Sequence, residues 1–124
     1  MPDLSVPDTA RFAQQLKKGV LEMLVLRLLA DHPSHGYELI QRLRQGSGGM
    51  LELKEGTLYP ILYRLEDEGC ITSAWKNTEP GKQRPAPRKV YNVTPLGQQM
   101  LARQLETWHA FAACVEEFCK EETP

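Results

Sequence analysis

The chain begins with a long stretch in which apolar residues recur every three or four positions. They start at Ala10, and between Val20 and Ala30 nearly every position is apolar. This spacing predicts helical structure over about residues 8–30, with the second half buried on most sides. The pattern leaves open whether Gly19 divides this segment into two helices. His32-Pro33 should end it, because proline disfavours the helical conformation in the residue before it.

Two shorter amphipathic helices are predicted next, on either side of a glycine-rich turn at residues 46–49. Ser34 is the candidate N-cap of the first. A short strand at residues 51–53 should lead into the second helix, over about residues 55–69, which has two distinct sides. Its apolar side carries Leu58, Ile61, Leu62 and Leu65, and its other side carries Thr57, Tyr59, Pro60, Tyr63 and Arg64.

The second half of the chain predicts a hairpin and a long helix. Residues 71–76 and 88–94 suit two strands, with a turn at Pro80-Gly81. Thr94-Pro95 is a strong helix start, since it combines an N-cap residue with proline at the first helical position. Apolar residues then follow a heptad spacing that suits contact with another helix. This seam comprises Leu101, Leu105, Trp108, Ala112, Val115 and Cys119.

The order of elements predicts a mainly α fold with a small β-hairpin. We expect a winged helix-turn-helix domain over residues 1–94 and a C-terminal dimerisation helix over residues 95–124. No apolar run is long enough to cross a bilayer, and the N-terminus lacks the pattern of a signal peptide, so the expected location is the cytoplasm. The cysteines, Cys70, Cys114 and Cys119, are expected to be reduced thiols in apolar positions.

Charge is segregated along the chain, although the formal total is only −1. Residues 76–91 carry a net charge of +4, whereas residues 96–124 carry −3. Such a distribution suits a protein with one end facing phosphate and the other facing away from it.

Several short motifs, in one order and with consistent spacing from about residue 19 to residue 98, resemble the PadR family of bacterial transcriptional regulators. They are His35-Gly-Tyr-Glu-Leu39, Glu55-Gly-Thr-Leu-Tyr-Pro-Ile-Leu62, Arg64-Leu-Glu, Glu68-Gly69 and Tyr91-Asn-Val-Thr-Pro-Leu-Gly97. The resemblance implies a dimeric DNA-binding repressor whose long C-terminal helix mediates dimerisation.

The helix at residues 55–69 is the candidate reading helix for the DNA major groove, because its acidic residues crowd the C-terminal end and leave the N-terminal part free to approach DNA. Thr57 and Tyr59 are predicted near base edges or the backbone, and Arg64 at a guanine or phosphate. The alternatives are that Tyr59 packs inside the fold and that Arg64 pairs with Asp67 or Glu68. Predicted phosphate or minor-groove contacts come from Lys82, Arg84, Arg88 and Lys89, with weaker candidates at Lys17, Ser34, His35 and Tyr37.

The dimer is expected to have two-fold symmetry and to bind a roughly palindromic operator. Its predicted interface comprises Leu16, Leu101, Leu105, Trp108, Ala112 and Val115. Trp108 is either a core tryptophan of this interface or one wall of a slot for a planar apolar effector. By resemblance to multidrug-binding family members, Leu105 and Phe111 would flank that slot.

The sequence contains little evidence for other classes of function. The histidines are scattered without a metal-ligand spacing, and no catalytic or dinucleotide-binding motif is present, so neither an enzyme, a cofactor nor a metal is expected. The alternative is a winged-helix module that binds protein and not DNA. The basic segment at residues 76–91 argues against it, because a protein-binding module has no need to gather positive charge there.

Overall fold

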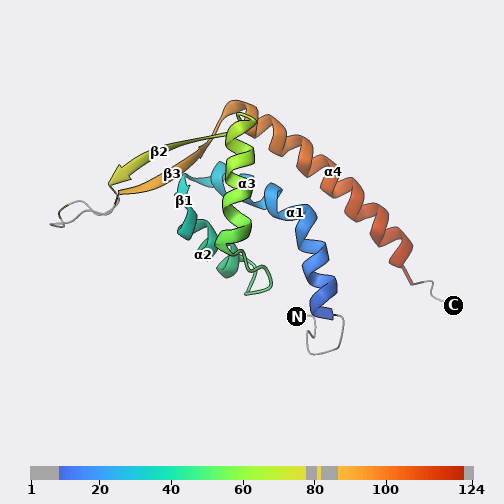
Figure 1. Cartoon of the computed structure of the whole chain (residues 1–124). Coiled ribbons are helices and arrows are strands. Elements are labelled where there is room, and N and C mark those ends of the chain that lie inside the picture. Colours follow the sequence, from blue (N-terminus) through green and yellow to red (C-terminus); the bar gives the residue numbers. More distant parts are fainter. Residues whose placement is uncertain (1–8, 78–80, 82–86, 122–124) are drawn as a thin grey trace.

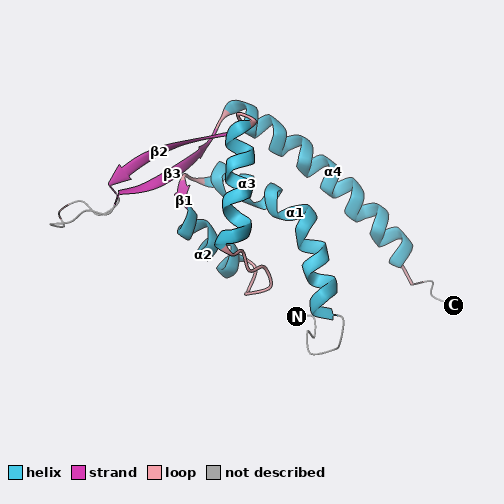
Figure 2. Ribbon diagram, in the orientation of Figure 1, coloured by secondary structure: helices cyan, strands magenta, loops and turns pink. Residues whose placement is uncertain are grey.

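A computed structural model describes residues 9–77, 81 and 87–121 of the chain. Within them the fold is mainly helical, with a small antiparallel sheet and a long final helix, as predicted (Figures 1 and 2). The elements in order are α1 (Thr9–Asp31), β1 (Ser34–His35), α2 (Gly36–Gly46), α3 (Glu55–Asp67), β2 (Ile71–Asn77), β3 (Pro87–Val93) and α4 (Pro95–Cys119).

The core is built around the second half of α1. Val25 and Leu26 are completely buried, and of residues 20–30 only Arg27 is exposed, so the prediction that this segment is buried on most sides is confirmed. It packs with the apolar sides of α2 and α3 and with Tyr91 of β3. Gly19 does not interrupt α1, which continues as one helix through both halves.

Two local predictions between α1 and α3 are wrong. Ser34 is not the N-cap of α2, because it pairs with Tyr91 as part of β1 and is buried. His35 takes the cap position, and its Nδ1 accepts a hydrogen bond from the backbone N–H of Glu38 at 3.2 Å. Residues 51–53 form no strand, since they pair with no neighbouring strand; Leu53 is inserted into the core from an irregular loop.

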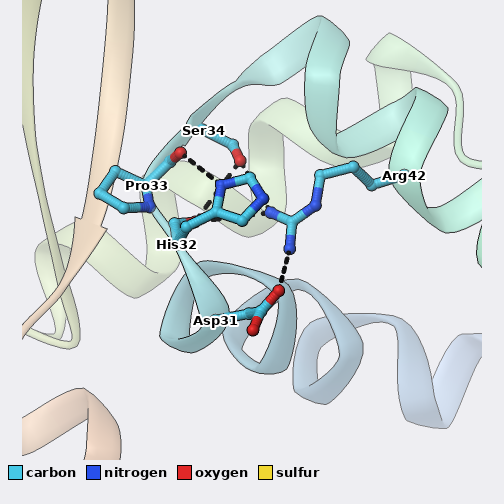
Figure 3. Close-up of polar contacts among 5 residues, drawn as sticks. All are labelled: Asp31, His32, Pro33, Ser34 and Arg42. Carbon is cyan, nitrogen blue, oxygen red and sulfur yellow. Dashed lines mark hydrogen bonds and ion pairs between the residues drawn. The ribbon is translucent and has the colours of Figure 1, made fainter.

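Arg42 holds the corner between α1 and α2 (Figure 3). From the middle of α2 its guanidinium donates to Oγ of Ser34 at 2.8 Å and pairs with the carboxylate of Asp31 at 3.1 Å. It also donates to the backbone carbonyl of His32 at 3.4 Å. These contacts fix β1 at the edge of the sheet, whose strand order is β1-β3-β2.

The wing, formed by β2 and β3, is joined to both α3 and α4. The hydroxyl of Ser73 in β2 donates to the carboxylate of Glu66 in α3 at 2.5 Å. Thr94 caps α4 as predicted, accepting from the N–H of Gly97 at 3.0 Å, and its hydroxyl donates to the carbonyl of Gly69 at 2.6 Å. The start of α4, the end of α3 and the base of the wing therefore meet at one corner.

Only the first half of α4 packs against the domain. Leu101 is buried and Leu105 is half-buried against the core, but the second half extends away from the other elements (Figure 1). Cys114 and Cys119 are exposed in this second half, so the prediction that they occupy apolar positions is wrong for the single chain. The same prediction is confirmed for Cys70, which is buried. The difference arises because both cysteines lie in the second half of α4, beyond the part of that helix that packs against the core within the described residues.

Candidate nucleic-acid interface

The two sides of α3 are divided as the sequence predicts. Leu58, Leu62 and Leu65 are buried, whereas Thr57 and Tyr63 are exposed. Lys54, the N-cap residue, is also exposed, and its side chain makes no capping hydrogen bond. The beginning of α3 thus presents a cation, a hydroxyl and a backbone terminus that carries partial positive charge, a combination suited to a phosphate-rich partner.

Tyr59 lies between the interior and the surface, and it packs against the first residue of α2. A Cβ atom placed on Gly36 would lie 2.7 Å from the Tyr59 hydroxyl oxygen, so only glycine leaves room for this ring. The Tyr59 ring is also 6.1 Å from that of Tyr63, centroid to centroid. The Tyr59 side chain is therefore engaged largely in packing inside the fold, which is one of the two interpretations that the sequence offers. Tyr63 is the more exposed of the two tyrosines.

Arg64 forms an ion pair that neither sequence interpretation names. Its Nε and Nη2 atoms donate to the two carboxylate oxygens of Glu22 in α1, at 3.2 and 3.4 Å. The predicted alternative partners, Asp67 and Glu68, are not involved. About half of the Arg64 side chain remains exposed, so the guanidinium is held in place but not enclosed.

The beginning of α2 and the first residues of β3 bring two further candidates together. Nη1 of Arg88 lies 3.5 Å from Nδ1 of His35, the residue that caps α2. Tyr37, on the first turn of α2, is exposed. Ser34 is buried with its hydroxyl bound by Arg42, which gives it a role inside the fold and removes it from the candidate DNA contacts.

In the wing, the structure describes Arg88 and Lys89 but not Lys82 or Arg84, which lie outside the described residues. Lys89 Nζ is 5.9 Å from the centroid of the Tyr91 ring. Burial, followed by the influence of Tyr59 and Glu66, raises the pKa of Tyr91 to about 12. Tyr91 therefore stays neutral under physiological conditions and is the residue by which β3, the strand that carries Arg88 and Lys89, packs into the core.

A groove of about 670 Å³ lies between α1 and α4. Lys17, one of the predicted DNA contacts, lines this groove. Trp108 and Phe111 also line it, whereas the third residue predicted for the effector slot, Leu105, packs against the core. Within the described residues, the buried amide oxygen of Gln104 in the groove wall accepts no hydrogen bond.

Sequence reasoning missed three residues that shape this interface: Glu22, Arg42 and Lys54. A signal existed for Lys54, which directly precedes the helix start. Glu22 and Arg42 act on partners 42 and 8 or more positions away, and periodicity alone gives no indication of such pairs.

Comparison with known proteins shows the family to which this chain belongs. The sequence profile described as the transcriptional regulator PadR-like family matches residues 25–103, which covers α2, α3, the wing and the start of α4. The chain belongs to the PadR-like family. A crystal structure of a PadR family regulator from Eggerthella lenta is similar, with a TM-score of 0.76 and 30% identity, over 90% of this chain and 92% of that one.

Two relatives that are named as transcriptional regulators support the same assignment. A transcriptional regulator of Mycobacterium tuberculosis is 31% identical over 71% of this chain and 75% of its own length. The negative transcriptional regulator PadR of Bacillus subtilis is 32% identical over 66% of this chain, which spans 43% of that protein. Membership of this PadR-like family makes the chain a DNA-binding transcriptional regulator.

Two further properties concern the described part of the chain only. None of its helices is both long and apolar enough to cross a membrane. No group of three or more histidine, cysteine, aspartate or glutamate side chains is arranged there to hold a metal ion.

Proposed function

We propose that this PadR-like protein is a homodimeric repressor that binds a two-fold symmetric DNA operator through α3, the start of α2 and the wing. The observation that carries the proposal is the exposed side of α3, with Lys54, Thr57 and Tyr63, together with the His35–Arg88 pair, which joins the cap of α2 to the first residues of β3. A helix with one polar, exposed side fits the major groove, and flanking cations supply phosphate contacts.

In this proposal the side chains have different tasks. Thr57 and Tyr63 face base edges or the sugar-phosphate backbone, and Tyr59 supports them by packing over α2. Arg88 and Lys89, together with Lys82 and Arg84, contribute affinity that depends little on sequence. Arg64 contacts DNA only through the part of its guanidinium that Glu22 leaves open.

Dimerisation is supported by apolar side chains that the single chain leaves in water. They lie on the first half of α1 and the second half of α4, where a second copy would cover them; they are Phe12, Leu16, Trp108, Phe111, Val115 and Phe118. A soluble protein rarely exposes so many large apolar residues on neighbouring helices without a partner. We propose that residues 95–124 act as the dimerisation unit and residues 1–94 as the DNA-binding unit.

The groove between α1 and α4 is the proposed site of a small planar effector. Its wall combines an aromatic surface, Trp108 and Phe111, with the unsatisfied amide oxygen of Gln104, so an apolar molecule with one hydrogen-bond donor would fit its chemistry. A ligand that prefers one spacing of the two DNA-binding units must weaken binding that needs another. The negative regulation named for the Bacillus subtilis relative supports the repressor role.

These roles make the protein a regulator and not an enzyme, and a role at DNA implies the cytoplasm. The second candidate function, a winged-helix module that binds protein, is favoured only by the near-neutral total charge.

Selection of bound duplexes from a random pool tests the proposal. We expect a two-fold symmetric site with half-sites about one helical turn apart. Failure to enrich any sequence would favour the protein-binding alternative.

A further inference from the structure

Glu22, near the middle of α1, contacts α3 on one side and the α1–α4 groove on the other. Its carboxylate oxygens accept from Nε and Nη2 of Arg64, at 3.2 and 3.4 Å. The same residue lines the groove together with Val20 and Met23. One residue therefore touches both the helix proposed to bind DNA and the cavity proposed to bind an effector.

The geometry of this ion pair constrains how the C-terminal half of α3 is oriented relative to α1. Two parallel N–H···O hydrogen bonds between a guanidinium and a carboxylate constrain angle as well as distance, which a single contact does not. Apart from its share of the common core, α3 packs chiefly against α2 and β2, and within the described residues the Arg64–Glu22 pair is its only ion pair with α1. A displacement of α1 consequently reaches the C-terminal half of α3 through Glu22.

In Figure 1 the first half of α1 lies on the same side of α3 as α4, and its second half passes behind α3. The first half of α1 forms one wall of the groove, while the second half is fixed in the core. Glu22 lies where these two halves join. The groove wall and the tie to α3 are therefore parts of one helix, less than two turns apart from Lys17 to Glu22.

We propose that Glu22 is a positioning residue that couples the α1–α4 groove to DNA binding by α3. The inference rests on the proposed function, in which α3 binds DNA. A change in the groove that moves α1 relative to α4 disturbs the pair between Glu22 and Arg64, and α3 changes its angle to DNA. Because coupling between two binding events is reciprocal, DNA bound at α3 must in turn alter the groove.

The test uses this reciprocity and requires no known effector. All proteins carry Trp75→Phe, so that fluorescence comes from Trp108 in the groove wall. The duplex recovered by selection is added at fixed protein concentration, and both its affinity and the change in Trp108 emission are measured. The variants are Glu22→Gln, which keeps the shape and removes the charge, and Glu22→Asp, which keeps the charge on a shorter stem. Glu106→Gln, at an exposed position of α4, is the matched control.

We expect DNA to change Trp108 emission in the reference protein and in Glu106→Gln. In Glu22→Gln this change should disappear and DNA affinity should fall about fivefold or more, the lower end of typical allosteric coupling. Glu22→Asp should restore part of both. A pair with a purely structural role would lower the thermal midpoint of Glu22→Gln but leave the DNA-induced change in Trp108 intact.

The contrary outcomes are distinct. If the reference protein binds the duplex without any change in Trp108 emission, the coupling is refuted while the proposed function stands. If Glu22→Gln changes the assembly state in sedimentation, Glu22 belongs to an interface between copies and the proposal fails. If the reference protein binds no duplex, the proposed function itself fails, and this inference with it.

Discussion

Replacing Gly97 with alanine should separate α4 from the base of the wing. A Cβ atom at this position would lie 2.0 Å from the carbonyl oxygen of Cys70 and 2.7 Å from a methyl carbon of Val93. The Cys70 carbonyl is backbone and already accepts from the N–H of Thr94 at 3.0 Å, so no side-chain rotation relieves the clash. The start of α4 must move, and with it the contact of Leu101 with the core.

Overpacked core positions usually cost about 1–3 kcal/mol, and a clash with fixed backbone belongs at the upper end of that range. We therefore expect Gly97→Ala to lower the free energy of unfolding by about 3 kcal/mol, or the thermal midpoint by roughly 10 °C. Urea denaturation at fixed protein concentration measures the change. Gly46→Ala is the control, because a Cβ there meets nothing within 4 Å and alanine favours a helix. A loss below about 1 kcal/mol for Gly97→Ala would refute this account of the α4–wing corner.

Three other predictions follow from particular side chains. Val115 lies beyond the part of α4 that packs on its own domain, so Val115→Glu should give monomers in sedimentation. Ala110→Glu, on the opposite side of the helix, should leave the dimer intact. If each of the two variants remains dimeric, the interface lies elsewhere. Gly36→Ala should displace the ring of Tyr59, so that DNA affinity falls markedly while the thermal midpoint changes little. A variant that binds DNA as tightly as the wild type would contradict the role given to that ring. Since the folded-state pKa of Tyr91 is raised to about 12 from 10.0, its contribution to stability, on the order of 2 kcal/mol, is present below pH 10 and should be lost between about pH 10 and 12. Tyr91→Phe should flatten that part of the stability profile, and an unchanged profile would contradict the assignment.

The sequence predicts those features that depend on neighbouring residues. The two sides of α3 follow from 3.6-residue spacing, and the start of α4 follows from the Thr94 cap and the proline after it. Both are local properties, in which the chain's own hydrogen bonds and apolar pattern decide the outcome. The family motifs extended this reasoning to DNA binding.

Features that depend on tertiary register could not be predicted in this way. Ser34 is a good N-cap residue, yet pairing with Tyr91 across the sheet moves the cap to His35. Arg64 has acidic neighbours at helical spacing, but the carboxylate that meets it comes from α1. In both cases an interaction between sequence neighbours, which is modest in energy, is replaced by an interaction with a distant residue that forms only after the helices and strands have packed.

The central claim, that the exposed side of α3 and the basic wing bind DNA, is tested most directly by the salt dependence of binding to the selected duplex. A dimer that neutralises about six to ten phosphates should give a slope of log K against log salt of roughly −5 to −9. Changing Arg88 and Lys89 to alanine should make this slope shallower and weaken binding to all sequences alike, whereas Tyr63→Ala should change the preferred sequence and keep the slope. A wild-type slope near zero would contradict the account.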